Sequence, residues 1–212
     1  MAIIQGSALG SFKGKLGNLV CYQLNGKNVV RSAPGKSKKN KIGTPLQNVY
    51  RSKFTKLQHF LQPIILFIRV GFNLESHLQL MTAHNAAKSY NMLNAFREDG
   101  EIDCSKVVVS FGNLPGAADV AIAVDDVGFH FSWANNALTH TARSDDQVML
   151  LAYSPSKRDA QVLLSGAKRK AGQETLELWS GCKGNSYHVW MAFISDDRQR
   201  ISMSSYLGEV TF

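Results

Sequence analysis

The chain has 212 residues, of which 44% are hydrophobic, so it can form one large domain or a domain with a smaller module, and wholesale disorder is excluded. Its formal net charge of +8 is unevenly distributed, because the first 70 residues contain 12 of the 24 Lys and Arg but none of the 16 Asp and Glu. The charge is therefore +12 in this segment and −4 in the remainder. This asymmetry predicts a basic part that contacts an acidic partner, joined to a slightly acidic body.

The N-terminal residues carry a strong β-hairpin signal. Two strand-like runs, 19–24 and 27–31, flank Asn25-Gly26, a pair that tolerates the positive φ angles of a tight turn. The basic run 36–41 follows and is typical of an exposed loop. We therefore expect residues 1–43 to form a basic, glycine-rich hairpin arm.

Helices are expected next. Thr44-Pro45 supplies an N-cap followed by proline at the first helical position. Apolar residues then recur at three- and four-residue spacing as far as about residue 70, and Pro63 should kink or divide this helix. A second helix is expected over about 75–96. Residues 44–98 are thus predicted to be a helical segment of two helices.

After residue 100 the pattern changes to short β-rich runs separated by turn residues. The expected strands are 106–111, 119–124, 127–133, 147–153, 160–164, 175–179, 187–194, 201–204 and 208–212. Their number and spacing favour an antiparallel β-sandwich of immunoglobulin or fibronectin type over residues 106–212, with Trp133 as a core residue. The predicted fold class is therefore α+β, an N-terminal hairpin and helices followed by this sandwich.

No enzyme motif is found, and we expect neither catalysis nor a cofactor. His77 and His84 could share a helix face, but no carboxylate or cysteine stands between them at ligand spacing, so ordinary structural histidines are favoured over zinc. The acidic pairs Asp125-Asp126, Asp145-Asp146 and Asp196-Asp197 fall in expected turns, where Asp stabilises the local backbone. A calcium site made from these loops is the alternative.

The basic N-terminal segment is the candidate interaction site. Its residues are Lys15, Tyr22, Lys27, Arg31, Lys36, Lys38, Lys39, Lys41, Gln47, Arg51 and Lys53. Three interpretations stay open: an acidic protein surface, the phosphate backbone of a nucleic acid with tyrosines stacking on bases, and a face that is merely solvated. The acidic body of another copy is one available partner, and a head-to-tail contact of that kind makes rings or filaments.

The sequence also resembles a known family. The resemblance covers most of the chain and rests on the runs Gly14-Lys15-Leu16-Gly17-Asn18-Leu19-Val20, Thr44-Pro45-x-Gln47-x-x-x-Arg51-x-Lys53-Phe54, Phe131-Ser132-Trp133 and Ser202-x-Ser204-x-Tyr206-x-Gly208. These are similar to an uncharacterised family of about this length from Bacteroidota, which implies an architecture and no activity. The N-terminal part is also loosely similar to bacteriophage virion proteins, and this resemblance implies a repeated structural subunit.

Together these features predict a non-enzymatic structural protein that assembles with itself or with other subunits through its basic N-terminal module. The alternative is a nucleic-acid-associated protein that uses the same basic surface. Three separated cysteines, Cys21, Cys104 and Cys182, argue against a disulfide framework. The N-terminus lacks the pattern of a general secretory signal, and the longest apolar stretch, 60–72, is too short for a membrane span of roughly 20 residues. We therefore expect a soluble protein that is cytoplasmic or associated with a virion or particle.

Overall fold

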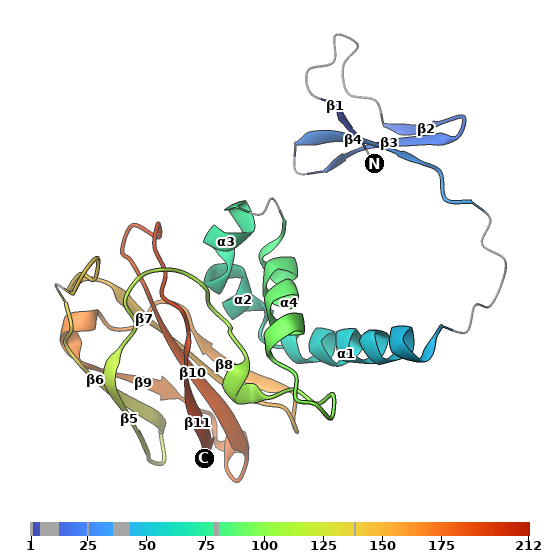
Figure 1. The fold of residues 1–212 in the computed structure, drawn as a ribbon. Helices are drawn as coiled ribbons and strands as arrows, with labels where there is room; N and C mark the ends of the chain where they lie inside the picture. The colour runs from blue at the N-terminus through green and yellow to red at the C-terminus, as the bar shows by residue number, and fades with distance from the viewer. Residues whose placement is uncertain (1, 5–12, 25, 36–42, 79–80, 138) are drawn as a thin grey trace. The chain divides into compact units, whose positions relative to one another are not determined.

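The computed structural model describes all residues except 1, 5–12, 25, 36–42, 79–80 and 138. The chain divides into two compact units, Met1–Pro45 and Leu46–Phe212. Helices and antiparallel sheets are both present (Figure 1), which confirms the α+β class.

The first unit contains one antiparallel sheet. Its strands are β1 (Ala2–Ile4), β2 (Gly14–Leu16), β3 (Leu19–Leu24) and β4 (Lys27–Ser32), in the order β1-β4-β3-β2. Leu24 pairs with Lys27, so the expected hairpin of β3 and β4 is confirmed. Gly26 has a φ of +75°, a left-handed value that glycine adopts without steric cost.

Four helices open the second unit. They are α1 (Pro45–Leu61), α2 (Ile65–Gly71), α3 (Asn73–Leu78) and α4 (Ala83–Asn94). The first helix ends two residues before Pro63, so the expected division is confirmed. The expectation of one continuous helix over 75–96 is wrong. Thr82 is an N-cap whose side chain accepts a hydrogen bond from the Asn85 amide, and it starts α4 as a separate helix.

Two sheets complete the second unit. The four-stranded sheet has the order β11-β10-β7-β8 and the three-stranded sheet has the order β5-β6-β9, and all pairings are antiparallel. The strands are β5 (Ala118–Val124), β6 (Gly128–Ala134), β7 (Gln147–Ser154), β8 (Asp159–Leu163), β9 (Gln173–Glu177), β10 (Ser186–Ile194) and β11 (Ser205–Thr211). Short 3₁₀ turns occur at Cys104–Lys106, Arg169–Ala171 and Ser180–Cys182.

Two of the expected strands are absent as strands. Lys106 ends a 3₁₀ turn, and the backbone of the next two residues bonds to side chains: Asn91 pairs with both backbone groups of Val108, and Trp190 Nε1 donates to the Val107 carbonyl. Residues 201–204 form only isolated bridges. Around Val107 and Val108, distant side chains thus replace the expected strand neighbour, whereas Ile201 and Ser202 bond to the backbone of Leu114 and Phe193.

The four-stranded sheet is buried on both faces. On one face, Met149, Leu151 and Trp190 belong to a core shared with α1, α2 and α4. On the other face, Leu150 and Val189 belong to a second core shared with the three-stranded sheet. Trp133 is 5% exposed and lies in that second core, as expected. The second unit therefore has three layers, helices, four strands and three strands (Figure 1).

Candidate interaction surface on the N-terminal segment

The register of the first unit brings several of the expected site residues onto one face of its sheet. Lys15 pairs with Val20, and Val20 pairs with Arg31, so these three residues form one row across β2, β3 and β4. Because side chains alternate between the faces of a strand, Tyr22 and Lys27 share this face. The guanidinium of Arg31 lies 5.6 Å from the centroid of the Tyr22 ring. Three basic side chains and one aromatic ring thus occupy one face.

This sheet has no second layer among the described residues of the first unit. Leu16 and Leu24 are 73% and 51% exposed, on opposite faces by register, and only Val29 is buried among the described side chains. A sheet in a stable domain normally covers at least one apolar face with another layer. The apolar side chains of this sheet are therefore suited to contact with another surface.

Helix α1 carries a second uncovered apolar surface. Leu46, Val49, Tyr50 and Phe54 recur at helical spacing and are 49–65% exposed. The same stripe continues into Leu57, Phe60 and Leu61, which are buried in the helical core. One apolar stripe thus begins in solvent and ends in the core. We call its exposed part, Leu46, Val49, Tyr50 and Phe54, the α1 stripe.

Basic side chains flank the α1 stripe. The ammonium of Lys88 lies 4.3 Å from the centroid of the Phe54 ring, and Lys53 lies 5.2 Å from that of Phe96. Arg51 is exposed and Gln47 lies in the first turns of the helix, whereas Lys56 pairs with Glu101. The rim of the α1 stripe is therefore cationic. The remaining expected site residues, Lys36, Lys38, Lys39 and Lys41, lie outside the described residues.

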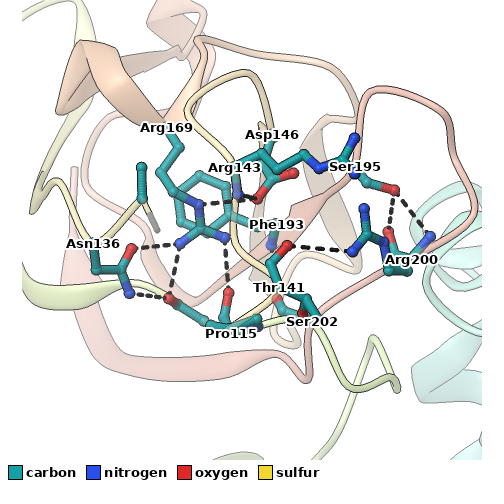
Figure 2. Close-up of polar contacts among 12 residues, drawn as sticks. Pro115, Asn136, Thr141, Arg143, Asp146, Arg169, Phe193, Ser195, Arg200 and Ser202 are labelled. Carbon is teal, nitrogen blue, oxygen red and sulfur yellow. Dashed lines mark hydrogen bonds and ion pairs between the residues drawn. The ribbon is translucent and has the colours of Figure 1, made fainter. Parts of the chain in front are cut away.

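Sequence reasoning missed a polar cluster around Arg169, which is fully buried (Figure 2). Its guanidinium donates to Asp146 Oδ2 at 3.2 Å, to Asn136 Oδ1 at 2.6 Å and to the carbonyls of Pro115 and Gly116 at 2.8 and 3.1 Å. Burial lowers the pKa of Arg169, and Asp146 opposes this shift. These contacts of Arg169 are all internal, and they connect three loops of the body. The run Lys168-Arg169-Lys170 gave no signal that its middle residue is buried.

Several of the histidines, and one or both residues of each acidic pair, have structural partners. His84 Nε2 lies 3.2 Å from Gln58 Oε1, and burial lowers the pKa of His84. Asp125 Oδ1 accepts hydrogen bonds from the amides of Val127 and Gly128, as expected for a turn. Asp146 Oδ2 accepts a hydrogen bond from the Arg143 amide at 2.8 Å, as expected for a turn, and Asp146 is also the buried partner of Arg169. Among the described residues, no group of three His, Cys, Asp or Glu is placed to hold a metal ion.

The cysteines of the described chain are unpaired. Cys21, Cys104 and Cys182 are all free thiols. Burial raises the pKa of the Cys104 thiol to about 11, which keeps it protonated and unreactive at neutral pH. None of the helices, over the residues described, is long and apolar enough to cross a bilayer.

The geometry defines a mixed α+β protein with an exposed, basic and partly apolar N-terminal segment. The sequence model of one protein family, described as Family of unknown function (DUF6266), matches residues 11–208. The chain belongs to this family, and the expectation of an uncharacterised family is thereby confirmed. Comparison with curated proteins gave no significant match.

Proposed function

We propose that this protein is a non-enzymatic structural subunit that assembles with further copies of itself through its N-terminal segment. The observation that carries the proposal is the α1 stripe. Solvent-exposed apolar residues are ordinary when scattered, but a contiguous stripe with a charged rim marks a protein contact. Covering these four half-exposed side chains would contribute on the order of 4 kcal/mol to association before the costs of binding.

The charges favour one mode of assembly. No Asp or Glu precedes Glu75, so two α1 stripes that faced each other would bring Arg51 and Lys53 close to their own copies. Like charges at a contact oppose it, whereas the −4 segment after residue 70 attracts a basic segment. We therefore propose that the N-terminal segment of one copy contacts the acidic body of the next. Such a heterologous contact closes into a ring or continues as a filament.

The body has a strand order that supports an immunoglobulin-like or fibronectin-like sandwich. With β5, β6 and β9 lettered A, B and E, and β7, β8, β10 and β11 lettered C, C′, F and G, the two sheets read A-B-E and G-F-C-C′. The sheets of the immunoglobulin fold divide these strands in the same way. Sandwiches of this type commonly serve as binding or structural modules. The proposed virion-like or particle-like role rests on the resemblance of residues 14–54, and the proposed origin in Bacteroidota rests on the resemblance of most of the chain.

Light scattering on a sizing column tests the proposal. We expect the protein to form a defined oligomer, and Tyr50→Glu to reduce its mass by placing a carboxylate in the α1 stripe. Leu66→Glu is the matched control, because Leu66 is 56% exposed on α2, close to the 58% of Tyr50, and lies outside the stripe. A monomeric wild-type protein, or equal masses for both variants and the wild type, would contradict assembly through α1.

One observation favours nucleic acid as the alternative partner. Lys15, Lys27 and Arg31 share a sheet face with Tyr22, an arrangement that can neutralise phosphates and stack a base. Binding of a labelled single-stranded oligonucleotide, measured at several salt concentrations, tests this function. Strong binding that weakens steeply with salt, and that Lys15→Gln and Arg31→Gln reduce while the oligomer mass stays unchanged, would favour it over self-assembly.

A further inference from the structure

A cavity of about 460 Å³ lies in the second unit, between the helical layer and the four-stranded sheet. Val70 of α2 and Leu74 of α3 form one apolar wall. Leu164, Ile194 and Ile201 form the wall on the side of the sheet. The volume falls within the range of small-molecule sites, which are mostly apolar with a few oriented polar groups.

Two arginines line this cavity. Arg198 Nη2 donates to Ser165 Oγ at 3.0 Å and also to Gln147 Oε1, while Ser165 Oγ donates to Gln147 Oε1 at 2.7 Å. This triangle fixes the guanidinium at the rim and leaves its Nη1 and Nε donors without a partner among the described residues. The side chain of Arg69 is exposed at the end of α2 and has no hydrogen-bond or ion-pair partner among the described side chains.

The backbone of Arg198 is held in a left-handed conformation, with a φ of +59°. Residues other than glycine, Asn and Asp seldom adopt this region, and such strain concentrates at functional sites. The Arg198 amide donates to the Ser195 carbonyl at 2.9 Å, which closes the turn that carries the side chain toward the cavity. The turn therefore positions a cation at an apolar cavity in spite of a local conformational cost.

Among the described residues that line the cavity there is no Asp or Glu, so its two positive charges are not compensated by them. A guanidinium prefers a planar carboxylate, which it binds through two parallel hydrogen bonds. The five aliphatic side chains of the walls favour an apolar tail over a hydrated inorganic anion. We propose that this cavity binds a small-molecule carboxylate with an aliphatic chain, its carboxylate between Arg69 and Arg198 and its chain against the apolar walls. This site is separate from the N-terminal segment and does not depend on self-assembly.

Titration with decanoate below its micellar concentration, followed by NMR of the full-length protein, tests the site. We expect saturable shifts of the Ser165 and Arg198 amides, with decanol binding far more weakly because it lacks the charge. Arg69→Gln and Arg198→Gln should each weaken decanoate binding on the order of tenfold, the usual effect of a lost charged hydrogen bond. Arg97→Gln is the charge-matched control, because Arg97 is exposed and does not line the cavity.

Three results would overturn the proposal. Shifts confined to Tyr50 and Phe54 would place decanoate on the α1 stripe. Binding of decanol as tight as that of decanoate would show that the carboxylate is not recognised. Equally tight binding of inorganic phosphate would show that the aliphatic chain is not recognised. Absence of saturable binding, or unchanged affinity in both Arg69→Gln and Arg198→Gln, would show that these arginines form no carboxylate site. Because no residue of the α1 stripe lines the cavity, failure here leaves the assembly proposal untouched.

Discussion

The guanidinium carbon of Arg169 lies 3.8 Å from the centroid of the Phe193 ring. A cation this close to an aromatic face gains electrostatic attraction in a site that excludes water. The N–H donors of the same guanidinium are satisfied by four acceptors, which are Asp146, Asn136 and the carbonyls of two loop residues (Figure 2). Phe193 belongs to the core between the two sheets, so Arg169 connects that core to the surrounding loops.

Arg169→Met should therefore be strongly destabilising, by about 3–5 kcal/mol, because it leaves the buried Asp146 carboxylate without its counter-ion. Urea unfolding monitored by tryptophan fluorescence measures the change. The double variant Arg169→Met with Asp146→Leu removes both charges and should recover part of this loss. A single variant that unfolds at the wild-type midpoint would show that the ion pair contributes little.

Asn91→Leu should lower the free energy of unfolding by about 2–4 kcal/mol. Asn91 is fully buried, and its side chain satisfies both the amide and the carbonyl of Val108, at 2.9 and 2.8 Å. Each backbone group left unpaired in the interior costs about 1–3 kcal/mol. Asn94→Leu is the control, because the Asn94 side chain is exposed and bonds only to the Tyr90 carbonyl of its own helix. Equal midpoints in thermal unfolding for the two variants would refute this account.

Gly71→Ala should destabilise the contact between α2 and the segment that follows α4. A Cβ at Gly71 would lie 2.2 Å from the Val109 carbonyl oxygen, a backbone atom that cannot move independently. Overpacking of this kind costs about 1–3 kcal/mol. At Gly116 the nearest atom to an added Cβ, Ser205 Oγ, is 3.7 Å away, so Gly116→Ala should be tolerated. Differential scanning calorimetry of the two variants provides the comparison.

Acidification from pH 7 to 5 should reduce stability. Burial lowers the pKa of His188, and burial together with Lys88 lowers the pKa of His84, below the ordinary value of 6.5. The unfolded chain therefore binds protons more readily than the folded chain. Above pH 6.5 both histidines are mostly neutral in the folded and the unfolded chain, so they do not reduce the free energy of unfolding. As the pH falls from 6.5 toward their lower folded-state pKa values, the unfolded chain binds protons first, and the free energy of unfolding decreases.

Urea midpoints at pH 7 and pH 5 measure this dependence. His188→Gln should reduce the difference between the two midpoints, since glutamine does not titrate and can still bond to the Tyr206 hydroxyl that lies 2.8 Å from His188 Nδ1. His140→Gln is the control, because the His140 side chain is exposed to solvent. An undiminished pH dependence in His188→Gln would assign the effect to other groups.

Local sequence patterns predicted most of the fold. The turn between Leu24 and Lys27, the helix start at Pro45 and the division near Pro63 were all predicted from neighbouring residues. Most of the expected strands also occur within a few residues of their predicted bounds. The segment 106–111 misled because its apolar pattern is that of a strand, whereas its backbone partners, Asn91 and Trp190, are distant in sequence. Partners that are distant in sequence cannot be predicted from the local periodicity of apolar residues.

The candidate surface was predictable in part. The charge asymmetry indicated the basic segment, but only strand register shows that Lys15, Tyr22, Lys27 and Arg31 share a face. The periodicity of α1 is the same at Leu46 as at Leu57, although the first is 65% exposed and the second is buried. Periodicity identifies the apolar side of a helix and contains no information on what covers it. The two arginines of the cavity come from segments far apart in the chain, so no motif could join them.

The position of β7 and β10, each packed against the helices on one side and the three-stranded sheet on the other, has a consequence for the dynamics of the body. Neither layer can separate without exposing residues of the strands that both layers share. Local opening should therefore be confined to the edges. The slowest amide hydrogens to exchange with deuterium are expected on Leu151 and Trp190, cross-strand partners in the central sheet, at a rate set by unfolding of the whole body.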